Sequence, residues 1–325
     1  MKLGLAPLAD FTDAPFRLMC FRGGADFAFT EMVSAAALLH GHGPTRHLME
    51  TLPGEGRVVC QFFGSAEQEL AFAAREAEKV RERFVGINLN AGCPMQRIMQ
   101  AGAGAKLIED PAKVHRLLKA MVENTSLPVS LKTRLGPHRS EPRIMELLDA
   151  AESAGAKAIA VHARSTGQKH GGPLNLELLA ETVRRARIPV YGNGSVCTGA
   201  DLDAMAATGV EGVLIGRAAL GNPAIFAQLK GEDASGRWGV TGPAAEHLKL
   251  ILEFRDMLAR KYPEDHVPSP DGIASIKMHT HLFRYFKGRP GAAALRARLN
   301  AIRTLDEVRA VIEGRFESAA AEGGS

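Results

Sequence analysis

The chain has few cysteines and no long hydrophobic run. Four cysteines among 325 residues form no C-x-x-C pair, which argues against a zinc site and against a disulfide framework. No apolar run reaches the roughly 18 residues that a membrane-spanning helix needs. The apolar stretch before Asp10 is too short for a signal peptide. We therefore expect a cytoplasmic protein with no metal and no membrane partner.

The composition indicates a folded protein but does not choose its partners. Hydrophobic residues make up 46% and charged residues 23%, which suffices for a sizeable core and excludes disorder for most of the chain. The formal net charge of +4 is compatible with an anionic ligand or a nucleic acid and establishes neither. The length suits two average domains, or one barrel of roughly 250 residues with an appendage.

Short apolar runs alternate with helical segments along the first two thirds of the chain. This alternation predicts parallel strands that are buried on both faces. Eight such units suit a closed (β/α)8 TIM barrel, over residues 1–235, better than an open doubly wound sheet. The predicted strands are 3–7, 26–32, 58–64, 86–90, 128–134, 158–164, 189–194 and 212–217.

The alternation stops after residue 231, where a polar, glycine-rich stretch begins. Helical periodicity follows, and it predicts a small all-helical domain over residues 243–317 and a disordered tail over 318–325. The predicted helices are 243–261, 271–287, 291–302 and 305–315.

Cys93 is the cysteine best placed for a chemical role, because it follows a predicted buried strand in Asn88-Leu89-Asn90-Ala91-Gly92-Cys93-Pro94. Gly92 permits a tight turn, and the segment 101–105 predicts a mobile flap that excludes water. No histidine lies near Cys93 in sequence to activate a nucleophile. A thiol of ordinary pKa stays protonated at neutral pH, so the general-acid role needs fewer assumptions. The other three cysteines are interpreted as small hydrophobic residues.

Glycines follow the last two predicted strands, where many barrels hold a phosphate. Gly192-Asn193-Gly194 and Gly216-Arg217 predict a phosphate cradle, because glycine lets backbone N–H groups approach closely and a guanidinium matches the anion. The alternative is that these glycines only form tight turns.

Cations and a histidine stand at the ends of strands five and six. Lys132 and Arg134 lie on the same side of one strand, so they predict contacts with a flavin edge and with a phosphate or carbonyl, or else an ion pair with Glu31. His162 and Arg164 repeat the spacing, as a ligand contact or as a structural histidine. Gln61 suits a flavin or base edge, or satisfies loop backbone.

Together these motifs resemble the tRNA-dihydrouridine synthases, in the family's order along the chain. The matching pieces are Ala6-Pro7-Leu8-Ala9, Thr12-Asp13, Thr30-Glu31-Met32-Val33, Gln61, the 88–94 segment, Gly102-Ala103-Gly104-Ala105, Lys132-Thr133-Arg134, His162-Ala163-Arg164, Gly192-Asn193-Gly194 and Gly216-Arg217. Two features, the spacing of the 88–94 motif and the acidic segment 108–111, lean towards the C-type bacterial branch. The segment 165–172 lacks the family's common aromatic residue, and Met95-Gln96-Arg97 stands where a lysine is frequent.

The resemblance implies an FMN barrel, reduced by NADPH or NADH, that converts uridines of tRNA to 5,6-dihydrouridine. It implies hydride transfer from flavin N5 to uracil C6, protonation of C5 by Cys93, and a contact of Asn90 with uracil or flavin. The implied FMN ligands are Pro7, Leu8, Ala9, Gln61, Lys132, His162, Asn193, Gly194, Ser195, Gly216 and Arg217. The residues expected to approach tRNA are Arg134, Arg164, Lys277, Arg284 and Arg298.

The stretch from Lys277 to Arg303 carries seven lysines or arginines and no acid, with histidines and aromatic residues between them. Such a stretch favours salt-dependent binding of tRNA phosphates. The alternative is a solvated helix face whose aromatic residues lie in the core. We expect a monomer that binds one tRNA. Two other functions remain open at this point: an FMN barrel that reduces a free pyrimidine or enone, and a tRNA-binding protein without catalysis.

Overall fold

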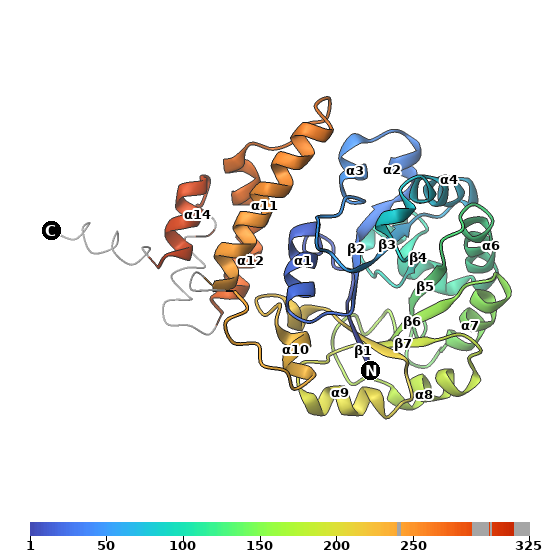
Figure 1. Cartoon of the computed structure of the whole chain (residues 1–325). Helices are drawn as coiled ribbons and strands as arrows, with labels where there is room; N and C mark the ends of the chain where they lie inside the picture. The colour runs from blue at the N-terminus through green and yellow to red at the C-terminus, as the bar shows by residue number, and fades with distance from the viewer. Residues whose placement is uncertain (239–241, 288–298, 300, 315–325) are drawn as a thin grey trace.

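The computed structural model describes residues 1–238, 242–287, 299 and 301–314, and its centre is a closed parallel barrel (Figure 1). Each strand pairs with the next in chain order, and β8 pairs with β1. The predicted (β/α)8 architecture is therefore confirmed. The strands are β1 Lys2–Leu5, β2 Phe27–Ser34, β3 Arg57–Phe63, β4 Gly86–Ala91, β5 Val129–Arg134, β6 Ala158–His162, β7 Val190–Asn193 and β8 Gly212–Ile215.

Helices cover the outside of the barrel, and several start where capping chemistry predicts. Asp110 accepts a hydrogen bond from the Lys113 N–H at 2.9 Å, with Pro111 in the first helical position. The helices are α1 Ala14–Arg22, α2 Ala35–Leu39, α3 Gly43–His47, α4 Glu67–Glu78, α5 Gln96–Gln100, α6 Pro111–Val122, α7 Ile144–Ser153, α8 Leu176–Arg185, α9 Gly199–Ala206 and α10 Ile225–Leu229. The short 3-10 helices are η1 Arg81–Arg83, η2 Gly104–Glu109 and η3 Arg217–Ala219.

Burial explains why the strands could be recognised as apolar runs. Every residue of β4 and β8 is buried, as expected for strands that face the barrel interior on one side and helices on the other. Inside the barrel, Phe29, Ala160 and Leu214 form a small separate apolar cluster. The barrel is therefore a filled core, and its open space lies at the ends of the strands.

The helices after the barrel, α11 Gly242–Lys261, α12 Pro270–Tyr285 and α14 Leu305–Ile312, lie together beside α1 (Figure 1). We call them the C-terminal helices. They share a core of their own, which includes Ile251, Met278 and Val308. The predicted tail 318–325 and most of the predicted helix 291–302 lie outside the described residues, and the domain boundary near 235–243 stays a prediction. None of the helices described is long and apolar enough to cross a membrane.

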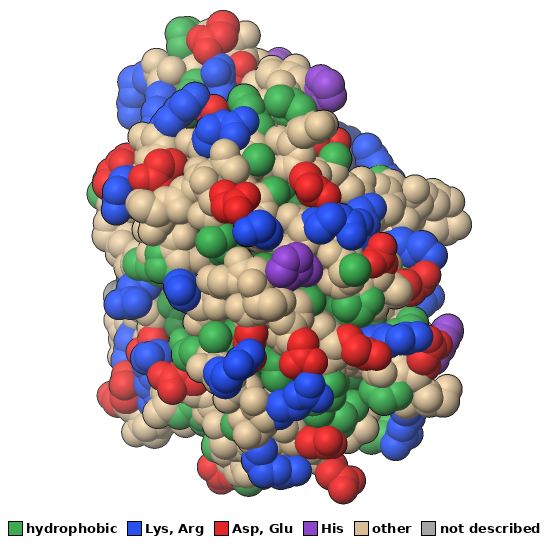
Figure 2. Space-filling model, turned by 90° about the vertical axis from the view of Figure 1, so that its right-hand side faces the viewer, with side chains coloured by type: hydrophobic (Ala, Val, Ile, Leu, Met, Phe, Trp, Pro, Cys, Tyr) green, Lys and Arg blue, Asp and Glu red, His purple; other side chains and the backbone are tan. Residues whose placement is uncertain are grey.

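The outer face over α4, α6 and α7 mixes charges of both signs (Figure 2). Its cations have acidic partners, as in the pairs of Arg116 with Glu67 at 3.1 Å and of Lys119 with Glu123 at 2.8 Å. Exposed pairs of this kind contribute little to stability, and a face of mixed sign attracts no polyanion.

One ion pair, in contrast, is entirely buried between α1 and the segment before β3. The Arg17 and Glu55 side chains are 1% and 2% exposed, and the Arg17 Nε–Glu55 Oε2 distance is 2.7 Å. The guanidinium also donates to the carbonyls of Thr12 and Glu50. Burial raises the pKa of the Glu55 carboxyl even beside this arginine, which shows how costly its charge would be without a partner.

Replacing Arg17 by Met is expected to lower the free energy of unfolding by about 3–5 kcal/mol, because it leaves the Glu55 charge buried and unpaired. The double variant Arg17→Met/Glu55→Leu should recover most of this loss. Urea denaturation of the full chain, followed by circular dichroism, measures both. The control is Arg116→Met on the outer face, expected to cost about 1 kcal/mol or less. Equal losses for the two single variants would contradict the assignment.

Candidate functional site

A cavity of about 370 Å³ opens at the carboxyl ends of the strands. This volume lies within the usual range of small-molecule sites, about 300–1,000 Å³. Most of the residues singled out in the sequence line it: Pro7, Leu8, Ala9, Asn90, Cys93, Lys132, Arg134, His162, Asn193, Gly194, Ser195, Gly216, Arg217 and Arg284. The lining residues that sequence analysis did not assign are Ala6, Phe11, Met32, Gly92, Pro94, Met95, His170 and Leu220.

The register of the sheet explains why these residues meet. Asn90 on β4 lies beside Lys132 on β5. One step nearer the mouth, Arg134 on β5 lies beside His162 on β6, which lies beside Asn193 on β7. Parallel strands in this register bring the polar ends of four runs, far apart in sequence, to one edge of the barrel.

Buried amides below the cavity hold Asn90. Its Nδ2 donates to Gln61 Oε1 at 2.8 Å, and the Gln61 Nε2 donates to Asn88 Oδ1 at 2.8 Å. Asn88 in turn donates to the Ser130 hydroxyl at 2.8 Å. Gln61 is fully buried and is not among the residues that line the cavity. Gln61 therefore supports Asn90 in this structure, and its expected contact with FMN stays a prediction.

Asn90 positions the loop that carries Cys93. Its Oδ1 accepts the N–H groups of Gly92 at 3.1 Å and of Cys93 at 3.0 Å. The thiol is partly buried, and this burial raises its pKa, although the Met95 backbone, Arg134 and Lys132 oppose the effect. Cys93 is therefore protonated at neutral pH, as a general acid requires.

The segment after Cys93 is not the mobile flap that its glycines predicted. Gly104 and Ala105 are buried, and they begin η2. The Ala105 N–H donates to the Cys93 carbonyl at 2.9 Å. Gly104 has φ +59°, and an added Cβ would lie 2.8 Å from the same carbonyl. This glycine serves close packing beneath Cys93, so the prediction of a flap was wrong.

Charge in the cavity has one sign. Lys132, Arg134, Arg217 and Arg284 line it, and no Asp or Glu is among the described residues of the lining. Burial, and then the nearby Arg134, lower the pKa of Lys132 to about 7. The Lys132 Nζ hydrogen bonds to Asn193 Oδ1 at 3.2 Å. Neighbouring cations in a partly buried site repel one another, and a bound anion lowers this electrostatic cost. The cavity therefore suits a ligand with a phosphate and an electron-rich ring edge.

Arg134 is tied to backbone carbonyls on two loops. It donates to Gly92 at 2.8 Å, to Ser165 at 3.1 Å and to Lys169 at 2.6 Å. These bonds join the Cys93 loop to the loop after β6. Arg134 thus lines the cavity, but three of its donors already hold the walls together.

The two histidines of the cavity are uncharged. Burial, and then the nearby Arg134 and Lys132, lower the pKa of His162 to about 2. His170 stacks on it with a centroid distance of 6.2 Å, and burial lowers its pKa too. His170 lies in a loop with no periodicity, so its place beside His162 had no signal in the sequence.

Arg164, which was expected to approach tRNA, is not in the lining of the cavity. Its guanidinium donates to the Gly172 carbonyl at 2.9 and 2.8 Å.

The turn after β7 has the geometry of an anion cradle. Gly194 has φ +136° and Ser195 has φ +49°, both in the left-handed region. A Cβ on Gly194 would lie 2.7 Å from Leu174 Cδ2 and 3.0 Å from His162 Cδ2, so only glycine fits. Such turns direct successive backbone N–H groups towards one anion, and Arg217 lines the same cavity.

The three residues after the barrel that were expected to bind tRNA differ in their positions. Arg284 on α12 reaches the barrel mouth and lines the cavity. Lys277, seven residues earlier, points inward to Asp13 at 3.6 Å and Glu31 at 3.9 Å, so it binds barrel acids instead of lying on the surface. Arg298 lies outside the described residues.

The sequence is similar to known proteins along nearly its whole length. The sequence profile of the family described as dihydrouridine synthase matches residues 4–321. A curated tRNA-dihydrouridine synthase B of Pseudomonas putida is 32% identical over 99% of this chain and 95% of its own length. The corresponding protein of Xanthomonas axonopodis pv. citri is 32% identical over 98% and 93%. A probable tRNA-dihydrouridine synthase of Treponema pallidum is 34% identical over 88% and 84%. The chain belongs to the dihydrouridine synthase family.

Proposed function

We propose that this protein reduces specific uridines of tRNA to 5,6-dihydrouridine with bound FMN, and that NADPH or NADH restores the reduced flavin. One observation supports the proposal most strongly. The barrel-mouth cavity is lined both by the protonated thiol of Cys93 and by several cations, and no Asp or Glu is among its described lining residues. Family membership over nearly the whole chain supports the reaction class.

FMN fits the donors of this cavity. The cradle at Gly194, Ser195, Gly216 and Arg217 would hold the phosphate, and Lys132 would donate to the electron-rich edge of the ring system. Pro7, Leu8 and Ala9 supply an apolar wall, and His162 and Asn193 add neutral hydrogen-bonding groups. When bound, the flavin supplies the hydride for uracil C6.

The protein's own part in the chemistry is protonation. A base that accepts hydride at C6 gains electron density at C5, and the Cys93 thiol delivers a proton there. Asn90 holds the thiol loop in place and presents its amide to the cavity. Arg134 keeps the two loops of the mouth together, near the target nucleotide.

A cation that reaches the mouth from outside the barrel supports a substrate larger than a free base, namely a nucleotide in RNA. Arg284 extends the positive lining onto α12. The outer face over α4, α6 and α7 mixes charges of both signs, so it is less favourable for a polyanion than the cations of the mouth. The target uridine leaves its stack to reach Cys93. An FMN barrel for free pyrimidines, the alternative, has no use for such a cation.

The branch of the family stays a prediction. The 88–94 motif and the acidic segment 108–111 lean towards the C-type branch, whereas the relatives from Pseudomonas putida and Xanthomonas carry the letter B.

Incubation with unmodified tRNA and NADPH should produce dihydrouridine, mapped by mass spectrometry. In Cys93→Ala we expect the rate to fall by about 100-fold or more, because the proton donor is lost. Flavin reduction by NADPH should be unchanged, and the exposed-thiol variant Cys197→Ala should retain the full rate. No product from any tRNA or reductant would refute the function. A normal rate in Cys93→Ala would refute only the general-acid role.

The pH dependence of kcat/KM for tRNA should show a flat region over about pH 7–8.5 and a fall above it. The sign follows from the raised pKa of Cys93: the protonated form is active, so activity is lost as pH rises through that pKa. In Cys93→Ser the alkaline limb should disappear, because the hydroxyl does not titrate in this range. A midpoint below the ordinary thiol pKa would contradict the assignment.

Lys132→Met should raise the Kd for FMN by at least about tenfold, since it removes a buried charge-assisted donor. Fluorescence titration of the flavin-free protein measures the effect. Lys169→Met removes one charge close to the mouth but outside the cavity lining, and it should leave the Kd within about twofold. Equal effects in both variants would show that only net charge matters.

A further inference from the structure

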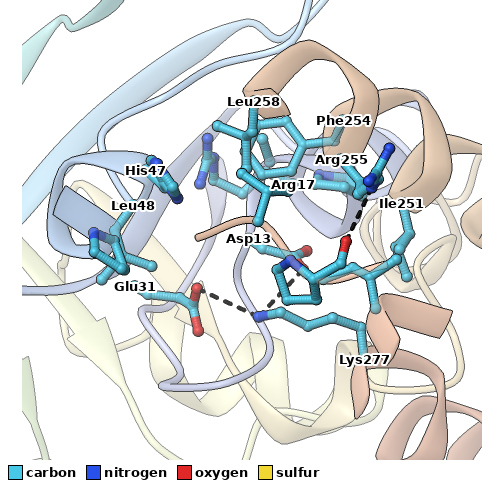
Figure 3. A pocket seen from close by; sticks show the side chains of 16 residues that line it. Asp13, Arg17, Glu31, His47, Leu48, Ile251, Phe254, Arg255, Leu258 and Lys277 are labelled. Atoms are coloured by element: carbon cyan, nitrogen blue, oxygen red, sulfur yellow. Dashed lines mark hydrogen bonds and ion pairs between the residues drawn. The ribbon is translucent and has the colours of Figure 1, made fainter. Parts of the chain in front are cut away.

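A second cavity, of about 170 Å³, lies between the barrel and the C-terminal helices (Figure 3). We call it the junction cavity. Its walls come from both parts of the chain: the start of α1, β2 and α3 on one side, and α11 and α12 on the other. A single water occupies about 30 Å³ of liquid, so this space exceeds what one bridging water fills.

The walls are largely apolar. Leu48 and Pro44 face Ile251, Phe254, Leu258 and Ile273 across the space. Water in such a space makes few hydrogen bonds, and an apolar group that displaces it gains affinity.

One buried oxygen in this cavity lacks a hydrogen-bond partner. Glu31 is 5% exposed, and no group among the described residues lies within hydrogen-bond distance of its Oε2. Lys277 reaches towards it from α12, but the Nζ–Oε2 distance is 3.9 Å, too long for a hydrogen bond (Figure 3). The Lys277 distance to Asp13 Oδ2, 3.6 Å, is also long. A group that both donates and accepts can bridge Nζ and Oε2 from the cavity side, beside the line that joins them.

The other charged groups of the lining have their own partners. Arg17 pairs with Glu55 at 2.7 Å, and His47 contacts Asp265 at 2.7 Å. Arg255 donates to the Pro268 carbonyl at 2.9 Å. The Glu31–Lys277 gap is therefore the polar end of the junction cavity among the described residues.

The charges at this end select a neutral head group. A ligand ammonium would be repelled by the Lys277 ammonium, and a ligand carboxylate would be repelled by the carboxylates of Asp13 and Glu31. Burial raises the pKa of Glu31 to about 7, so the carboxyl changes protonation near neutral pH. A hydroxyl has one donor and two acceptor positions, so it matches either form of Glu31.

We propose that the junction cavity binds a small neutral alcohol, with an apolar body of about one ring and a hydroxyl that bridges Glu31 Oε2 and Lys277 Nζ from the cavity side. Since both parts of the chain contact this ligand, its binding stabilises their association. The site is separate from the barrel-mouth cavity and does not depend on the proposed reaction.

Four probes of one shape test the head group: benzyl alcohol, toluene, benzylamine and benzoate. With the full chain we expect saturable binding of benzyl alcohol by saturation-transfer NMR, at least about tenfold tighter than the other three. In Glu31→Gln, the penalty against benzoate should shrink, because one of the two negative charges is gone. Comparable binding of toluene would overturn the hydroxyl contact.

Two substitutions on one helix test the location. Ile273→Phe fills the junction cavity and should abolish benzyl alcohol binding. Ile276→Phe adds the same bulk at a side chain that is 64% exposed, and it should leave binding unchanged. Binding that persists in Ile273→Phe, or a crystal soak that shows only water between Glu31 and Lys277, would overturn the proposal.

Discussion

The position of the Asn90 side chain decides the geometry of the barrel mouth. Its oxygen accepts two consecutive backbone N–H groups, which fixes the loop that carries Cys93. Its nitrogen is held from below by Gln61 and by the sulfur of Met32. In a buried setting, a fully satisfied polar network permits one arrangement, because any other leaves a donor unpaired. The reactive loop thus derives its order from the strands beneath it.

The same strands impose an electrostatic cost. Lys132 is half-buried among other cations, and its lowered pKa reflects the free-energy cost of a charge at that position. A barrel selected only for stability would pair this ammonium with an acid, as Arg17 is paired with Glu55. The cavity leaves the charge available for an anionic ligand. The unpaired ammonium lowers the stability of the folded protein, and contacts elsewhere in the fold must offset this loss.

The sequence predicted what local chemistry determines. Strand positions followed from apolar runs, and the end of each run located Cys93, Lys132 and His162 at the mouth, because parallel strands share one carboxyl edge. Contacts between distant segments could not be read in the same way. The inward direction of Lys277 depends on barrel acids more than 240 residues earlier. The role of Gly104 likewise depends on the Cys93 carbonyl, which no glycine pattern reveals.

Helix α12 connects the C-terminal helices to the barrel-mouth cavity. Lys277, His281 and Arg284 recur at helical spacing, so they lie along one face of the helix. Lys277 meets the barrel acids, His281 packs against Phe11 and Phe16 of the β1–α1 region, and Arg284 enters the cavity. Burial lowers the pKa of His281 well below its ordinary value, so this contact is an uncharged one at neutral pH. The ring contacts of His281, together with the longer ion pairs of Lys277, therefore hold the helix where Arg284 reaches the cavity, and the barrel alone would present an incomplete cavity. This dependence favours a substrate large enough to touch both parts of the chain, as a folded RNA does.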